Sequence, residues 1–467
     1  MIYIVKGLLY GDEGKGSIVD YLTVCGGEIV KEGGPQAAHH VVSTNGMLHR
    51  SEQMGSGIFN KGVKTFCSKN MLIFPQNLIT ENMKLYEAGI YNGMKRMLID
   101  SRCVVVTPLH QMIGRLIEVA RNNKRGSTGM GVGQAVRDKK ILTVHDITNS
   151  IVLHSKLHDL FYEKFEQASI IVKNNPNNKK LAELYKYYIN SISIETLYNS
   201  YRNFVLAYSQ CIELDGDNYF NTLLKSNKNL VFEGSQGALL DPDFGFKPYV
   251  SPVKNTFSMS EKLIGNKVSK KNIKRIGVIR AYSTRHGAGP FVTYNSTLTR
   301  TLQDIHNNTN QWQGHFRIGW FDLLAVRYSI MINGNVDLVA LTNLDRLSQL
   351  NNILVCSSYE YIGNNEELLD DYFEYDHIKV KNRITGFKKP KKPINKTISK
   401  ILLDCKPLDF ETFPGWNCSI LNNIKTMKDL PNEAINYIKF LQSEDGFNVP
   451  ISIISVGETS KNKILIQ

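Results

Sequence analysis

Gly11-Asp12-Glu13-Gly14-Lys15-Gly16-Ser17 is the stretch of this sequence that decides the fold. It follows the short apolar run Ile2 to Val5, and a helix is expected to begin near Ile18. Glycines let the backbone close tightly around a phosphate, and the first amides of a helix point toward such an anion. Lys15 adds a positive charge at the same place. The stretch therefore predicts a strand, a phosphate-binding loop and a helix in succession.

The loop departs from the Walker A pattern in two ways. The spacing GxxxxGK requires a glycine where this chain has Leu9, and the carboxylates of Asp12 and Glu13 lie inside the loop. Acidic side chains in a phosphate cradle are unfavourable unless one binds the magnesium that accompanies a nucleotide, or accepts a proton from a substrate. The two carboxylates therefore make this loop a candidate site of chemistry as well as of binding.

Short apolar runs recur along the chain and predict a buried parallel sheet. They are rich in β-branched residues and bounded by loop residues, as is typical of strands that are covered on both faces. The runs are Ile2 to Val5, Leu230 to Phe232, Ile276 to Ile279 and Val336 to Leu341. Helix-like stretches lie between them at Leu109 to Ala120, Lys179 to Ile189 and Asn432 to Leu441. This alternation predicts an α/β fold with a large, mostly parallel sheet flanked by helices.

We expect a single domain over residues 1–467, with two additions to the sheet. The region of about 150–228 has helical character and carries no catalytic motif, so a helical insertion that caps the sheet is expected there. The region of about 357–409 is polar and is expected to form a surface subdomain.

Composition narrows the possible partners and compartment. A net charge of +13 suits nucleic acid, an anionic small substrate or a lysine-rich surface. Much of the excess lies in Asn/Lys-rich stretches that are typical of surface loops, which argues against nucleic acid. No apolar run approaches the roughly 20 residues that span a bilayer, and the seven cysteines include no CxxC pair. We expect a cytosolic protein with reduced cysteines and no nucleic-acid or membrane partner.

Three further segments carry groups that could bind or activate a phosphorylated ligand. His39 and His40 end Gly33 to His40, directly after the strand-like run Glu28 to Lys31, where an imidazole could act as an acid or polarise an oxyanion. Arg125 to Gly133 offers hydroxyls and amides suited to another phosphate. A third segment, Phe232 to Asp241, follows a buried strand, and a constrained loop after it supplies the Ser251 hydroxyl.

A strand-end aspartate supplies a candidate base reader. Val336 to Leu341 runs into Thr342-Asn343-Leu344-Asp345, which resembles the guanine-reading NKxD element. In that element the aspartate accepts hydrogen bonds from the ring N–H and the exocyclic amine of guanine. The order of these elements, from a phosphate loop to a guanine reader, is typical of a P-loop-like GTP-binding fold.

Taken together, these motifs resemble the adenylosuccinate synthetase family, in the same order over nearly the whole chain. The matching stretches are Gly11 to Asp20, Gly33 to His39, Ser127 to Gly133, Phe232 to Ser251, Ala281 to Arg285 with Gly287 to Phe291, Gly319 to Asp322, Thr342 to Leu347, Pro414 to Trp416, and Val449 to Gly457. The resemblance implies a GTP-dependent ligase that phosphorylates the 6-oxygen of IMP and displaces the phosphate with the amine of L-aspartate. The products would be adenylosuccinate, GDP and phosphate.

The resemblance also implies roles for individual residues. Asp12 would remove the purine N1 proton, and His39 would stabilise the charge that develops on the 6-oxygen. Magnesium would bind at Asp12 and Ala38. GTP would be held by Gly11, Glu13, Gly14, Lys15, Gly16, Asp345, Ser455 and Gly457. The purine nucleotide would be held by Gln36, Ala37, Thr128, Gln236 and Ser251, and the amino-acid donor by Arg317 and His315.

Several positions depart from the family pattern. Gln36, Ala38, His40 and Asn343 stand where the family has asparagine, glycine, threonine and lysine. The stretch after Lys140 is shortened, so the arginine that the family sends across a homodimer interface to the nucleotide phosphate has no clear counterpart. Only Arg317 remains of an arginine-rich loop that grips L-aspartate. Two alternatives therefore stay open: the same activation chemistry with another amine donor or purine nucleotide, and a non-catalytic nucleotide-binding paralogue.

Overall fold

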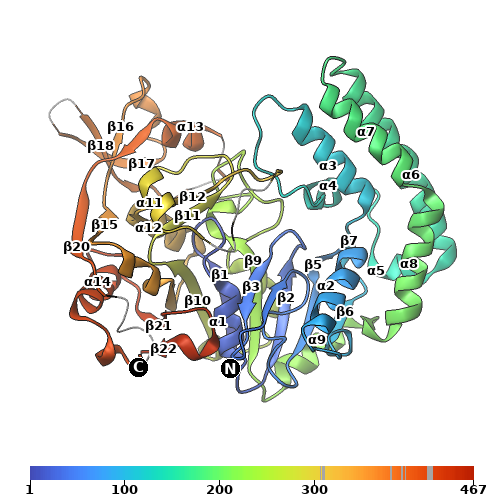
Figure 1. Cartoon of the computed structure of the whole chain (residues 1–467), viewed down its shortest axis with the longest axis horizontal. Coiled ribbons are helices and arrows are strands. Elements are labelled where there is room, and N and C mark those ends of the chain that lie inside the picture. Colours follow the sequence, from blue (N-terminus) through green and yellow to red (C-terminus); the bar gives the residue numbers. More distant parts are fainter. Residues whose placement is uncertain are drawn as a thin grey trace.

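The fold is built on one large, mostly parallel sheet (Figure 1), described by a computed structural model of residues 1–304, 307, 311–378, 381–390, 393–394, 396–417 and 424–466. The strand order is β22-β21-β14-β10-β1-β9-β2-β5-β6-β8, and β7 also pairs with β5. The bounds are β1 Ile2–Gly7, β2 Glu28–Gly33, β5 Lys64–Ile73, β6 Met97–Asp100, β7 Val104–Val105, β8 Ile212–Glu213, β9 Leu230–Gly237, β10 Ile273–Arg280, β14 Leu338–Thr342, β21 Ile451–Ser455 and β22 Lys463–Leu465. Only β22 pairs antiparallel to its neighbour among these strands of the described sheet.

The predicted strands lie in the middle of this sheet. Strand β1 pairs in parallel with β9 on one side and β10 on the other. Ile4 and Val5 are fully buried, and each belongs to a different hydrophobic cluster because successive side chains point to opposite faces. The α/β prediction is therefore confirmed, and the β-branched runs form strands because both faces of the sheet are covered.

Helices cover both faces and extend to one side (Figure 1). Their bounds are α1 Lys15–Leu22, α2 Pro75–Glu87, α3 Pro108–Ala120, α4 Val132–Arg137, α5 Val144–Thr148, α6 Ser150–Lys173, α7 Lys179–Ser191, α8 Ile194–Tyr208, α9 Gly216–Lys225, α10 Ser258–Ile264, α11 Ser296–Thr301, α12 Leu323–Asn333, α13 Thr397–Leu403 and α14 Asn432–Gln442. Within the described residues, no helix combines the length and apolar character needed to cross a bilayer. The six described cysteines are free thiols.

The two regions outside the predicted sheet have distinct structures. Residues 150–208 form α6, α7 and α8, whose apolar faces pack into one cluster with α2 and α3. The chain then returns to the sheet edge as β8 and α9. Residues 357–409 contain a four-stranded antiparallel sheet of β16 Tyr359–Tyr361, β17 Phe373–Ile378, β18 Lys381–Phe387 and β19 Cys405–Pro407.

Smaller strand pairs complete the described fold. A β3–β4 hairpin spans His39–Val42 and Leu48–Ser51, and β11 Ser283–His286 pairs with β12 Phe316–Gly319. A three-stranded sheet holds β13 Phe321–Asp322, β15 Asn352–Cys356 and β20 Phe410–Pro414. The carboxyl ends of β1, β2, β9, β10 and β14 meet at one edge of the main sheet, where α/β folds bind their ligands.

Candidate active site

The loop after β1 has an unusual backbone that places Asp12 at its tip. Gly11, Asp12 and Gly14 have φ values of 91°, 58° and 82°, so three of four successive residues are in the left-handed region. Glycine adopts this region freely, whereas an aspartate is held there by its surroundings. Arg280, at the end of β10, supplies part of that restraint because its Nε donates to the Asp12 carbonyl.

Glu13 organises the inside of the same loop. Its Oε1 accepts hydrogen bonds from the backbone amides of Leu9 at 3.1 Å and Gly11 at 2.7 Å. Its Oε2 forms an ion pair of 2.7 Å with Lys15 Nζ. Both side chains are almost fully buried, so Glu13 holds the loop closed and fixes the lysine ammonium.

His39 is held by a buried polar cluster that spans three strands. Its Nδ1 lies 2.5 Å from Glu233 Oε1, and its Nε2 lies 3.1 Å from the Ser235 carbonyl. Glu233 also accepts hydrogen bonds from Lys31 Nζ at 2.7 Å and from the Ser56 hydroxyl at 2.5 Å. Burial lowers the pKa of His39, against the opposing effect of the carboxylate. Burial alone would raise the pKa of Glu233, but Lys31 and His39 outweigh it and hold that pKa well below the usual range.

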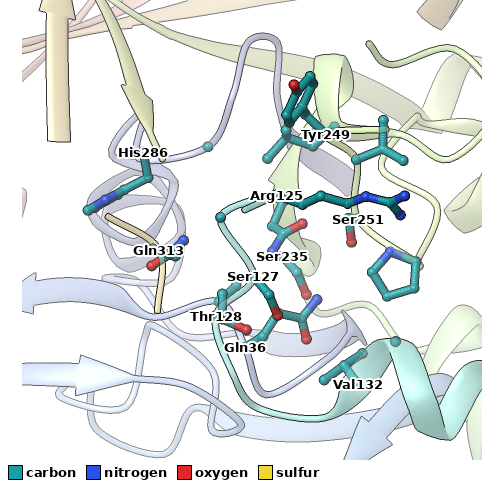
Figure 2. Close-up of a pocket in the computed structure, with 18 of the residues that line it drawn as sticks. Gln36, Arg125, Ser127, Thr128, Val132, Ser235, Tyr249, Ser251, His286 and Gln313 are labelled. Carbon is teal, nitrogen blue, oxygen red and sulfur yellow. The ribbon is translucent and has the colours of Figure 1, made fainter. Parts of the chain in front are cut away.

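A cavity of about 730 Å³ lies on one side of this cluster. Every residue predicted to hold the purine nucleotide lines it: Gln36, Ala37, Thr128, Gln236 and Ser251. Figure 2 shows Gln36, Thr128 and Ser235 meeting in its middle, with Ser251 on one side and His286 on the other. Both polar atoms of the Gln36 amide and Oε1 of Gln236 are buried without a hydrogen-bond partner among the described residues. Buried polar atoms of this kind are normally satisfied, so these atoms are positioned for a ligand.

A second cavity, of about 150 Å³, lies over the phosphate loop. Six residues that were predicted to hold GTP, from distant parts of the chain, line this cavity together: Gly14, Lys15, Gly16, Asp345, Ser455 and Gly457. Asp345 follows Asn343, whose φ of 59° turns the chain after β14. Burial raises the pKa of Asp345. Two other residues predicted for GTP do not line this smaller cavity. Gly11 lines the larger cavity, and Glu13 is buried within the loop, where it accepts a hydrogen bond from Lys15.

The two cavities meet at the predicted catalytic residues. Asp12, Ala38 and His39 line both of them. A group bound in the smaller cavity and a group bound in the larger one would therefore face each other across these three residues. His39 does not sit at the end of β2, as its sequence position suggested, but opens β3. The hairpin packs against α1, and this contact carries the histidine to the junction.

The residues predicted for the amino-acid donor lie apart from this junction. His315 is exposed, and neither it nor Arg317 is among the described residues that line the two cavities. Arg317 Nη2 donates to the carbonyls of Gly287 at 2.5 Å and Gly289 at 3.1 Å. Its strand partner Arg285 lines the larger cavity. Burial lowers the pKa of Arg285 to about 10.

Sequence reasoning gave no role to His40 and Asn307, which also line both cavities, and it missed three residues beside the junction. Glu233 lay inside a recognised motif but received no role, because its contact with His39 joins residues far apart in the chain. Arg280 could have been found from its place at the carboxyl end of a buried strand. His286 Nε2 lies 3.9 Å from Asp12 Oδ2, and its ring packs on Phe316 with centroids 4.8 Å apart. Nothing in its local sequence indicated this position.

Comparison with known proteins agrees with the geometry. A sequence model of the adenylosuccinate synthetase family matches residues 4–464. The chain belongs to the adenylosuccinate synthetase family. It is a GTP-dependent ligase of purine biosynthesis that forms a carbon–nitrogen bond between IMP and L-aspartate. Enzymes of this family typically require a divalent metal.

Individual relatives extend over almost the whole chain. The adenylosuccinate synthetase of Prochlorococcus marinus (strain AS9601) is 32% identical over 470 residues, which cover 99% of this chain and 96% of that protein. The organellar chromatophore enzyme of Paulinella chromatophora is 31% identical over 478 residues, with the same two coverages.

Solved structures show the same fold. The fully ligated adenylosuccinate synthetase of Plasmodium falciparum superposes with a TM-score of 0.80 at 23% identity, and the match covers 100% of this chain and 99% of that one. The succinoaminodeoxyadenylate synthetase of cyanophage S-2L, bound to dGMP and dATP, gives a TM-score of 0.52 at 14% identity over 99% and 95% of the two chains.

Proposed function

We propose that the ligase reaction takes place where the two cavities meet, with Asp12 as the base and His39 as the group that stabilises the 6-oxygen. The observation that carries this proposal is that both residues line both cavities. Asp12 takes the N1 proton of IMP, and the 6-oxygen then attacks the γ-phosphorus of GTP while GDP leaves. The 6-oxo group is a poor leaving group, and the phosphate ester is a good one. The amine of L-aspartate then displaces phosphate at carbon 6.

On the GTP side, the phosphate groups lie against the start of α1. The amides of Gly14 and Gly16, the Lys15 ammonium and the helix N-terminus all favour an anion there. Asp345 accepts the two guanine donors, and Ser455 and Gly457 line the same cavity. When GTP binds, the Lys15 ammonium turns partly from Glu13 toward the phosphates. An ammonium group has three donors and attracts phosphate as a point charge, so it can contact both partners.

On the purine side, the unpartnered amide of Gln36 supplies both a donor and an acceptor to the nucleotide. Gln236 offers its free Oε1, and Thr128 and Ser251 offer hydroxyls from two different loops. Ala37 contributes backbone groups beside Gln36.

The donor aspartate enters near the β11–β12 pair. Nε of both Arg285 and Arg317 is buried without a partner among the described groups, so two N–H donors remain for a carboxylate. Arg317 also holds the loop through Gly287 and Gly289, and the exposed His315 adds a polar group at its rim.

We assign Mg²⁺ to the Asp12 carboxylate and the Ala38 carbonyl oxygen. These are hard oxygen donors at the junction, and Mg²⁺ commonly takes only one or two protein ligands, with phosphates and water completing its shell. The described residues contain no cluster of three or more His, Cys, Asp or Glu side chains that could hold a metal by themselves. When bound, Mg²⁺ would offset charge on the β- and γ-phosphates.

Three wider properties belong to the same proposal. The enzyme works as a single domain with the 150–228 region as its insertion and the 357–409 region as its surface subdomain. Its free thiols suit the reducing cytosol. It forms a homodimer, because twofold-symmetric dimers are by far the commonest soluble homo-oligomers. Sedimentation of the purified chain tests the last point.

The deciding experiment measures GTP-dependent phosphate release together with the mass of the nucleotide product. IMP, GTP and L-aspartate should give adenylosuccinate as the sole adduct when other amino acids compete at equal concentration. Asp12→Asn should lower turnover by about 10² to 10⁴ through loss of the base, with an unchanged melting temperature. Normal phosphate release by this variant would refute the assignment of Asp12.

A further inference from the structure

The larger cavity is lined by more arginines and lysines than carboxylates. Arg125 and Arg137 both line it, and neither guanidinium has an ion-pair partner within the described part of the chain. Arg121, which lines the same cavity, is different because it pairs with Glu118 at 3.0 Å. Glu118 is further occupied by the backbone amides of Arg125 and Gly126, at 2.7 and 3.0 Å.

The arginines also oppose one another. Burial lowers the pKa of Arg137, and the charges of Arg121 and Arg125 lower it further. Burial lowers the pKa of Arg125 as well, again with a contribution from Arg121. Glu118 partly offsets the charge of Arg125, whereas Arg137 has no ion pair with any described carboxylate, and guanidinium groups gathered at a cavity wall favour an anion.

Both arginines lie near the loop that carries the Ser251 hydroxyl. Arg125 extends across the cavity toward Ser251 in Figure 2. Arg137 Nη2 lies over Gly133 of its own helix α4. A Cβ added to Gly133 would lie 3.0 Å from Arg137 Nη2 and 3.8 Å from Cγ of Pro252. The two guanidiniums therefore approach the loop that carries Ser251 from two different segments. An anion held there would receive bidentate donors from both sides.

We propose that Arg125 and Arg137 bind the phosphate of the purine nucleoside monophosphate, and that both come from the chain whose Asp12 acts on that nucleotide. The proposal rests on the proposed function, since it takes this cavity as the IMP site. A planar guanidinium matches two phosphate oxygens, whereas the neutral purine could not offset either charge. Both of these cations then come from one chain.

The first test compares Arg125→Ala and Arg137→Ala with the unmodified enzyme. Each should raise the KM for IMP by about 10- to 100-fold, the usual effect of losing hydrogen bonds to a charged group. The KM values for GTP and L-aspartate should stay within about twofold, as should the affinity for inosine, which lacks the phosphate. Lys139→Ala, which removes an exposed charge two residues beyond Arg137, is the control and should change none of these values.

Calorimetric binding of IMP without GTP separates this proposal from the proposed function. If the unmodified enzyme binds IMP but releases no phosphate with GTP and aspartate, the proposed function fails while the arginine comparison still stands. If Arg125→Ala and Arg137→Ala bind IMP as tightly as the unmodified enzyme, the arginine proposal is wrong. Loss of inosine affinity equal to the loss of IMP affinity would also overturn it.

Mixing two inactive variants tests whether the arginine acts in its own chain. Asp12→Asn and Arg137→Glu chains are unfolded together and refolded as a mixture. If Arg137 served the partner's site, mixed dimers would rebuild one intact site each and recover up to about a quarter of full activity. We expect no recovery beyond the sum of the two variants, because each chain carries one defect in its own site. Recovery at the higher level would overturn the assignment within one chain.

Discussion

Glu233 Oε1 lies 2.5 Å from His39 Nδ1, and the other ring nitrogen lies 3.1 Å from the Ser235 carbonyl. Both ring nitrogens thus face oxygen atoms, and these two contacts fix the orientation of the ring. Lys31 approaches the same carboxylate at 2.7 Å and keeps it ionised inside the protein. For His39 to stabilise a developing charge on the 6-oxygen, its Nε2–H must exchange the Ser235 carbonyl for that oxygen while Glu233 holds the other ring nitrogen.

Glu233→Gln should therefore lower kcat by about 10² to 10⁴, because the imidazole loses the carboxylate that fixes its tautomer and orientation. The change also leaves Lys31 buried without its ion-pair partner, which destabilises the fold. Glu32→Gln is a matched control, since it breaks the buried Lys6–Glu32 pair of 3.0 Å elsewhere in the sheet. Both variants should lose stability, measured by urea denaturation, but only Glu233→Gln should lose turnover. Equal kcat losses would assign Glu233 a purely structural role.

The base preference should depend on Asp345. In the proposed site its carboxylate accepts from the two donors of guanine, whereas an asparagine amide would place a donor against one of them. Asp345→Asn should raise the KM for GTP by about 10- to 100-fold, as expected for an unpaired buried polar group, and improve the use of xanthosine triphosphate. Glu458→Gln removes a negative charge from the same cavity and should leave the preference for GTP intact. A preference unchanged in Asp345→Asn would contradict the assignment.

The sequence predicted the central strands and the phosphate loop well because their signals are local. The ten-residue β5 was not predicted, since Ser68, Lys69 and Asn70 interrupt its apolar pattern. The junction could be predicted only as separate motifs, and contacts such as Lys31 with Glu233 join residues about 200 positions apart. Arg137 gave no signal at all, because its place beside Arg121 and Arg125 in the larger cavity is set by the fold.

Stability should depend on the protonation of Asp322, which caps α12 through the Ala325 amide and accepts a hydrogen bond from the Tyr359 hydroxyl. Burial raises the pKa of Asp322 from 3.8 to about 6, and the two hydrogen bonds only partly oppose it. The folded state therefore binds the proton more tightly than the unfolded state. The stabilisation that protonated Asp322 gives to the folded state is nearly complete below about pH 4, and it is lost as the pH rises through about 6.

Asp322→Asn removes this titration while keeping an oxygen acceptor for the cap and for Tyr359. Relative to the unmodified protein, its free energy of unfolding should gain about 2.5 kcal/mol between pH 4 and pH 7, because one pKa unit corresponds to about 1.4 kcal/mol and the effect is not yet complete at pH 4. Urea denaturation at several pH values gives the difference directly, and other titrating groups cancel in it. A difference that stays constant with pH would show that Asp322 titrates near its ordinary value in the folded protein.

Gly16 sets how closely the His39 hairpin approaches α1. A Cβ at this position would lie 2.8 Å from His39 Cβ, 3.2 Å from Ser56 Oγ and 3.3 Å from the His40 carbonyl. Alanine stabilises a helix by about 1 kcal/mol relative to glycine, so helix propensity alone would favour the exchange. The contact with His39 decides the outcome, because two backbone-anchored atoms at that distance cannot both stay in place.

Gly16→Ala should therefore move His39 away from the junction and lower kcat by at least about tenfold, since displacements of about 1 Å at a reacting centre carry such costs. Binding of IMP should change little, because Gly16 does not line the larger cavity. The melting temperature and the kcat are measured on the same preparation. A variant with both normal stability and normal turnover would show that the hairpin can shift without cost, and that the position of His39 relative to α1 does not limit the reaction.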